Sequence, residues 1–358
     1  MAFVHNASVE FTKSELDIFD FPPTQTSIEK SFFIEVQPIA ALADNAPLEF
    51  FISGSGEYYF DLNNTLLFIS CRVVKTDNSA IVDGSRVALI NYPLATLFNQ
   101  VDITLGDQLI SQSDNLYSYR AYIETLLNYS AQTLSSQFTS GLFYKDTAGH
   151  HNVRILDGTN AGFNKRALAI AHSKPVDLLG PIFGDIFNQP KLILNGLDLK
   201  IKLTRNKDSF CLMSAEADPF KVQIMHACLY VKRVQISLAV RIGHSQAMLT
   251  ATAKYSIDRV CMKVYSIPSA LYLDGQQIPS QPFKPIFNID LAVREYMALA
   301  HISGKQKSDC TLSIDREEFT DGFTFFAIDL SADQEPGGHF SLMKTELNNR
   351  REVLYDFY

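Results

Sequence analysis

The chain has 358 residues, a length that favours two domains or one large β domain, because single cores seldom grow beyond about 250 residues. Hydrophobic residues make up 46% and charged residues 20%, which excludes long disorder, and the net charge of −8 disfavours a tight nucleic-acid binder. No apolar run reaches the roughly 18 to 20 residues of a membrane-spanning helix, and residues 1–19 lack a signal-peptide pattern, so we expect a soluble, non-secreted protein.

The N-terminal part combines an irregular segment with clear strands. Residues 1–44 contain Pro22-Pro23 and Pro38 and little periodicity, which indicates an extended arm. Residues 67–73 alternate apolar and polar side chains, as a strand with one face on a core does. Residues 101–105 alternate in the same way before the turn pair Gly106-Asp107 and a returning strand, so we predict a hairpin there.

The segment 113–129 has the one helical pattern that stands out. Ser113-Asp114 can cap it, and Leu116, Ile123 and Leu127 recur at helical spacing. Arg120 and Glu124 lie one turn apart on another face. We expect one short amphipathic helix whose apolar stripe packs on the core.

Later segments again favour strands. Asn195-Gly196 joins two apolar runs and predicts a hairpin, because this pair readily takes positive φ at both central turn positions. Further strand-like runs lie at 222–234, 259–267, 271–273 and 323–330. The pattern indicates a β-sandwich or barrel class. Patterned strands pause around 242–251, where we place a domain boundary.

Motifs for catalysis or metal binding are weak. The nucleotide-binding, nucleophilic-serine and zincin signatures are all absent from the sequence. Asp146, His150 and His151 form the one candidate metal cluster, but adjacent histidines on an extended chain point to opposite sides, so surface-loop histidines are the better interpretation. We therefore predict no catalytic, cofactor-binding or metal-binding residues.

Other polar residues favour structural roles. Asp315, Glu317 and Glu318 surround Arg316 and indicate an exposed turn, not an acid–base pair. His226 lies within a strand pattern, where a core or edge histidine is expected. The five cysteines lack zinc or disulfide spacing and indicate free thiols in a reducing compartment: Cys71, Cys211, Cys228, Cys261 and Cys310.

Several separate phrases resemble the double jelly-roll major capsid proteins of Polinton (Maverick) elements and adintovirus-like viruses. They are PPTQTSI (22–28), APLEF (46–50), YFDL (59–62), LFNQV (97–101), YRAYIETLL (119–127), FYKDTAG (143–149), LILNG (192–196), AIDL (327–330) and GHF (338–340). Their order and spacing are similar along nearly the whole chain, and no general physical rule demands them.

This resemblance implies a non-enzymatic structural protein. It implies two antiparallel β-sandwiches side by side, with an arm at 1–44, a first jelly roll at 45–240 and a second at 241–358. Three copies would form a pseudo-hexagonal capsomer by head-to-tail contacts and tile an icosahedral shell with a penton-like minor protein. The shell would enclose DNA without sequence-specific binding and assemble inside the cell, in the nucleus, to give a virion.

The chain departs from the family pattern at two places. Residues 270 and 271 join two phrases that the family separates by further strands, and a similar pair of strands is missing at 345/346. We therefore expect an incomplete second roll, from real deletions or from gene prediction that skips exons. The alternatives are a host-retained or decayed copy that serves as a non-catalytic β-sandwich binding module, and a metal-dependent sandwich enzyme.

Overall fold

The computed structural model describes most of the first 264 residues and parts of the remainder. The described residues are 18, 24–44, 46–54, 56–112, 115–216, 219–255, 257–264, 272–273, 276–277, 283, 287, 292–306, 308–329 and 352–355. The expected cap at 113–114, the phrase at 338–340 and the expected deletions at 270/271 and 345/346 lie outside them.

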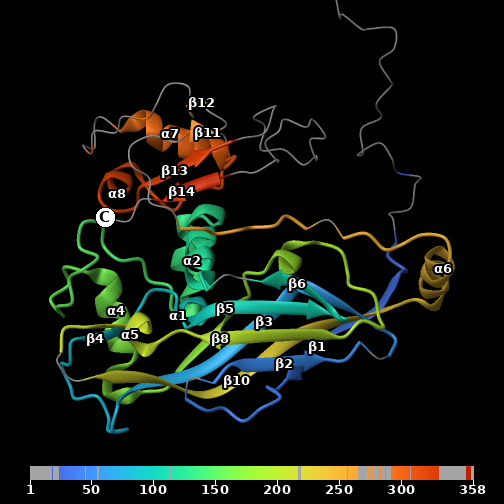
Figure 1. The fold of residues 1–358 in the computed structure, drawn as a ribbon, viewed down its shortest axis with the longest axis horizontal. Coiled ribbons are helices and arrows are strands. Elements are labelled where there is room, and N and C mark those ends of the chain that lie inside the picture. Colours follow the sequence, from blue (N-terminus) through green and yellow to red (C-terminus); the bar gives the residue numbers. More distant parts are fainter. Residues whose placement is uncertain are drawn as a thin grey trace, which may run out of the picture.

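Eight strands form two antiparallel four-stranded sheets (Figure 1). The first sheet has the order β1 (Ile28–Val36), β10 (Phe220–Ile236), β3 (Tyr58–Lys75) and β7 (Val176–Pro181). The second has the order β2 (Leu48–Ile52), β8 (Leu199–Arg205), β5 (Phe98–Leu105) and β6 (Gln108–Gln112). Each sheet therefore combines strands from distant parts of the chain. These two strand orders are those of an eight-stranded jelly roll. The prediction of an all-β, jelly-roll fold is confirmed.

Alternation along the strands explains why the two sheets close on one core. In β8, Leu199, Ile201 and Leu203 are buried while Lys200 and Lys202 are exposed. In β3 the side chains that we predicted to point into the core, at 67, 69, 71 and 73, are at most 2% exposed. These side chains meet between the sheets, where period-two patterning removes them from water.

One short strand pair, five helices and three 3-10 turns lie outside the two sheets. They are β4 (Val87–Leu89) paired with β9 (Leu212–Ser214), the helices α1 (Pro93–Thr96), α2 (Tyr117–Asn128), α3 (Ala131–Ser135), α4 (Ala161–Ala169) and α5 (Asp208–Cys211), and the 3-10 turns η2 (Gln137–Gly141), η3 (Ala171–Ser173) and η4 (Asp185–Asn188). The predicted amphipathic helix is therefore present as α2. It begins at Tyr117 and has no side-chain cap on its first turn.

Three sequence predictions were wrong in detail. Part of the expected arm, β1, pairs with β10 as an edge strand of the first sheet. The turn at Gly196 exists, with φ of 83°, but it joins no hairpin: Ile193 bridges to Phe60 of the first sheet while β8 pairs with β2 and β5 of the second. The turn is a crossing between sheets, which local propensity does not distinguish from a hairpin. Residues 259–264 form no strand and run as an extended strap over the roll.

The C-terminal part adds a small mixed layer. It contains α6 (Leu238–Met248), β11 (Tyr272–Leu273) paired with β12 (Gln276–Gln277), α7 (Val293–Ile302), α8 (Arg316–Thr320) and β13 (Phe325–Ile328) paired with β14 (Glu352–Tyr355). Leu299, Phe319 and Phe323 belong to the same buried cluster as the roll, so one core runs through both parts. Within the described residues no helix combines the length and apolarity needed to cross a membrane.

Candidate functional site

The predicted metal candidates do not meet in the structure. The Asp146 carboxylate accepts a hydrogen bond from Arg166 Nη2 at 2.7 Å, and His150 is exposed. His151 is half-buried, with its ring centroid 4.8 Å from that of Phe323. The described residues contain no group of three or more His, Cys, Asp or Glu side chains arranged to hold a metal ion.

The acidic residues at 315–318 cap a helix, and one of them forms an ion pair with a lysine of the roll. The Asp315 side chain accepts from the Glu318 amide at 2.8 Å, and the Glu318 carboxylate accepts from the Asp315 amide, which makes a capping box for α8. Glu318 also pairs with Lys145. The segment that we expected as a turn is the start of a helix. Asp315, Arg316 and Glu317 are exposed, as expected, and Glu318 is partly buried.

Lys145 is the centre of a clasp between the roll and the C-terminal part. Its ammonium group pairs with Glu318, donates to the Ser313 carbonyl at 2.7 Å and lies 4.4 Å from the centroid of the Phe323 ring. Burial lowers the pKa of Lys145, and the Glu318 carboxylate opposes that change. The clasp therefore joins the loop 143–151 to α8 and the turn after it.

His151 packs at the edge of the same clasp. The Gly149 amide donates to the Asp321 carbonyl at 2.8 Å, and Gly322, at φ 103°, leaves space for the His151 ring. A Cβ atom at residue 322 would lie 2.6 Å from His151 Cε1. His151 Nε2 is buried without a hydrogen-bond partner, and burial lowers the pKa of this imidazole. The contact region between the roll and the C-terminal part, which includes the clasp, is here called the joint. His151, which we predicted at the surface, is thus a packing residue of this joint.

A fully buried arginine holds the loop that carries Lys145. Arg166 Nε donates to the Leu89 carbonyl at 2.8 Å, its Nη1 donates to the Tyr144 carbonyl and its Nη2 binds Asp146. One guanidinium thereby connects α4, β4 and the loop 143–151. Its planar fork of donors suits this task, which a lysine could not perform with the same geometry.

A second buried charge cluster attaches the strap. Arg120 pairs with Glu124 at 2.7 Å and with Asp185, and their side chains are between 3% and 12% exposed. Asp185 Oδ1 accepts from the Val260 amide at 3.3 Å, and Arg120 Nη1 donates to the Val260 carbonyl at 3.4 Å. The predicted Arg120–Glu124 pair exists, but it lies inside the joint because the strap covers it. A cavity of about 290 Å³ lies beside it, between β6 and the strap.

The outer face of the first sheet, here called the outer wall, carries the exposed ring of Phe33 and the partly buried rings of Phe68 and Tyr230. Phe68 makes edge contacts with His226 at 5.8 Å and with Tyr230 at 6.4 Å between ring centroids. Phe33 on β1 is 52% exposed and lies opposite Lys232, two residues from Tyr230. His226 therefore faces outward at a register shift of β10 instead of lying in the core. Such a face is a candidate contact surface.

The cysteines divide by burial. Three are buried and two are exposed: Cys71, Cys211 and Cys228, then Cys261 and Cys310. Burial raises the pKa of the Cys71 and Cys211 thiols to about 12, so both are inert as nucleophiles near neutral pH. No local motif in the sequence marks Asp185, Arg166 or Lys145 as a buried or organising charge.

The comparisons with known proteins give one distant relative by sequence. No family model matches the chain. The uncharacterized protein F54H12.2 of Caenorhabditis elegans is 23% identical over 330 residues, which are 90% of this chain and 74% of that protein.

Similar solved structures come from viral particles. A cryo-EM structure of the Sputnik virophage matches with a TM-score of 0.41 and 10% identity, over 64% of this chain and 53% of that chain. The Faustovirus major capsid protein matches with a TM-score of 0.40 and 7% identity, over 68% and 59%. The mavirus major capsid protein matches with a TM-score of 0.33 and 14% identity, over 68% and 55%. The chain thus spans little more than half of these chains, and its own strand order, not these likenesses, establishes the jelly roll.

Proposed function

We propose that the chain is a non-catalytic shell subunit, a major capsid protein of the Polinton (Maverick) and adintovirus-like kind. The strand order β1-β10-β3-β7 against β2-β8-β5-β6 carries this proposal, since it builds the jelly roll that the resemblance of the sequence phrases implies. The ionisable groups of the joint support it, because they are bound in pairs and caps and leave no free acid–base couple among Lys145, Glu318, Arg166 and Asp146.

In this proposal three copies form a pseudo-hexagonal capsomer. Each copy contributes a complete first roll, which includes β1 and therefore begins near residue 28, and a shortened second roll at 241–358, while a penton-like protein fills the vertices. The rigid outer wall offers a side surface for subunit contacts, and the acidic net charge of −8 suits a container that encloses DNA without sequence-specific binding. Virions would form inside the cell, in the nucleus.

The deciding experiment is the mass in solution. Size-exclusion chromatography with light scattering gives about 120 kDa for a trimer, three times 40.1 kDa, and electron microscopy of that peak shows hexagonal capsomers if the proposal is right. Phe33→Asp on the outer wall should reduce the trimer fraction, whereas Leu168→Asp, also at an exposed apolar residue (71%), is the matched control. A stable monomer of 40.1 kDa without capsomers would show that these 358 residues do not assemble, and a monomer from the full-length transcript product as well would contradict the proposal.

The shortened second roll has its own test. If full-length transcripts carry additional codons at 270/271 and 345/346, the gaps arise from gene prediction and the longer product is the one that should assemble. If the transcripts match the 358 residues, open strand edges in the second roll should impair the trimer.

The second candidate is a host-retained copy that acts as a β-sandwich binding module. The Caenorhabditis elegans relative, similar over 90% of this chain, favours it because related sequences occur in an animal genome. Monomeric protein that captures a defined host protein or glycan through its loops would support this candidate, and capsomers would exclude it.

A further inference from the structure

Residues 292–306 and 308–328, here called the C-terminal lobe, are attached to the roll without a shared sheet. Within the described residues, β13 of the lobe pairs with β14 and with no strand of the two four-stranded sheets. Figure 1 shows the lobe beyond α2, on the side away from the two sheets. The lobe can therefore separate from the roll without breaking a strand ladder.

Three polar attachments hold the lobe at the joint. The first is the clasp at Lys145. In the second, the Gly149 amide donates to the Asp321 carbonyl at 2.8 Å, and in the third, Ser313 Oγ donates to the Leu126 carbonyl of α2 at 2.6 Å. All three reach the lobe in or beside α8, so one change at that place affects them together.

His151 fills the space beside these attachments. The imidazole is half-buried, its centroid lies 4.8 Å from that of Phe323, and Gly322 packs against the ring. Its Nε2 atom is buried and has no hydrogen-bond partner among the described residues. A neutral imidazole needs no donor at this nitrogen, whereas an imidazolium carries a donor at both ring nitrogens. A buried charged donor without an acceptor is costly, so the closed joint favours the neutral form.

The charged groups around the ring do not offset that cost. Four of them, from the loop 143–151 and from the lobe, act on the imidazole: Lys145, Asp146, Glu318 and Asp321. The ammonium repels an imidazolium and the carboxylates attract it, but two of the carboxylates already pair with Lys145 and Arg166. Burial outweighs the attraction and lowers the pKa of His151.

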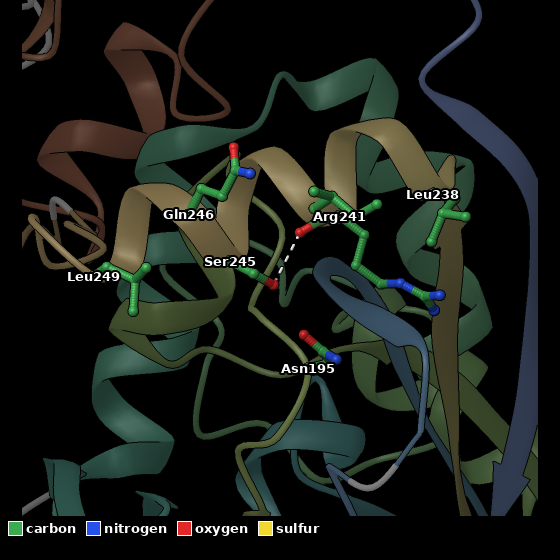
Figure 2. Close-up of a pocket in the computed structure, with 7 residues that line it drawn as sticks. Asn195, Leu238, Arg241, Ser245, Gln246 and Leu249 are labelled. Carbon is green, nitrogen blue, oxygen red and sulfur yellow. Dashed lines mark hydrogen bonds between the residues drawn. The ribbon is translucent and has the colours of Figure 1, made fainter.

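The hollow beside α6, on the side of the roll away from α8, has no comparable group (Figure 2). Its volume is about 530 Å³, and Arg241 is the one ionisable residue among those that line it. The Arg241 guanidinium pairs with Glu57 at 2.8 Å. His244, also on α6, lies 3.0 Å from the Tyr59 hydroxyl, which can donate to a neutral imidazole or accept from a charged one. We therefore locate a response to acid at the joint.

We propose that the joint is a proton-controlled contact, in which protonation of His151 in mildly acidic solution releases the C-terminal lobe while the two sheets stay closed. In the open state the imidazole faces water and its charge carries no burial cost. The open state therefore binds the proton more readily than the closed state, and a fall in pH favours opening. This device is independent of the proposed shell function.

Hydrogen exchange of the whole chain at pH 7 and pH 5, with each rate divided by the intrinsic rate at that pH, tests the proposal. Amides of α7 and α8 should exchange several-fold faster at pH 5, up to about 25-fold, the limit for one histidine whose pKa in the open state is about 6.5. Amides of β3 and β10 should be better protected at both pH values. No acceleration in α7 and α8, or protection at pH 5 equal to that of β3 and β10, would overturn the proposal.

Variants assign the effect to the imidazole. His151→Gln should bring the ratio of the exchange rates at pH 5 and pH 7 towards one, and an unchanged ratio would refute the role of His151. His226→Gln, at an outer-wall histidine that contacts Phe68, is the matched control and should keep the wild-type ratio. Because each ratio is taken within one variant, a change in the basal stability of the joint does not affect it. The wild-type measurement stands even if a variant fails to fold.

Discussion

Replacing Arg166 by Met should cost more stability than any surface substitution of the same kind. The Arg166 side chain is fully buried and serves three acceptors, namely the Leu89 carbonyl, the Tyr144 carbonyl and the Asp146 carboxylate. Methionine fills a similar volume but leaves two carbonyls without this donor and a carboxylate, 12% exposed, without its cation. Breaking a buried pair in this way costs about 3–5 kcal/mol.

The assay is equilibrium unfolding in urea, followed by far-UV circular dichroism. A loss of about 4 kcal/mol corresponds to a midpoint shift of about 1 M or more, a large share of the usual 5–15 kcal/mol. Asp146→Asn keeps an acceptor and should cost less. The matched control is Arg86→Met, whose pair with Glu216 spans 3.9 Å at a half-exposed surface and should contribute less than about 1 kcal/mol. Equal costs at residues 166 and 86 would refute the reasoning.

Three further predictions concern the clasp and the thiols. Gly322→Ala should destabilise the protein more than Gly196→Ala in thermal unfolding, because both have positive φ but only residue 322 would place a Cβ against His151; similar melting temperatures would contradict this. Burial lowers the pKa of His151, so its folded form binds fewer protons, and the stabilisation present above pH of about 6.5 is lost as the pH falls. His151→Gln should flatten the dependence of thermal stability on pH between pH 7 and 5, and an unchanged dependence would contradict this reasoning. A thiol reagent should label two cysteines in the native protein and the other three only after unfolding: Cys261 and Cys310, then Cys71, Cys211 and Cys228; fast labelling of a buried thiol would contradict the packing.

Alternation of apolar and polar residues was sufficient to locate a strand where one of its faces packs on the core. Residues 67–73 and the hairpin of β5 and β6 could be located from alternation and from Gly106, because those signals are local. The Asn195-Gly196 turn shows the limit of local signals. Its geometry was predictable, but whether its flanks pair depends on strands β2, β3 and β5, which lie about 90 to 150 residues away.

The candidate joint was less predictable than the roll. The spacing of Arg120 and Glu124 correctly indicates a pair, but nothing local shows that Asp185 and the strap enclose it. The same holds for Lys145, which meets Glu318 across 173 residues. The residues next to a charged side chain in the sequence do not show whether it remains in water or is buried by a distant partner.

The amino-acid sequence by itself determined a predominantly β chain, the helix after β6 with its Arg120–Glu124 pair, and the acidic net charge, since these depend on composition and on residues a few positions apart. It did not indicate the other helices, such as α4, α6 and α7. Only the tertiary structure decided that β1 leaves the arm to join the first sheet, that the two sheets have jelly-roll order, and that Arg166 and Arg120 are buried. The physical reason is that strand partners and buried charges are selected by global closure of the core, where loops of 100 residues cost little more entropy than loops of 50.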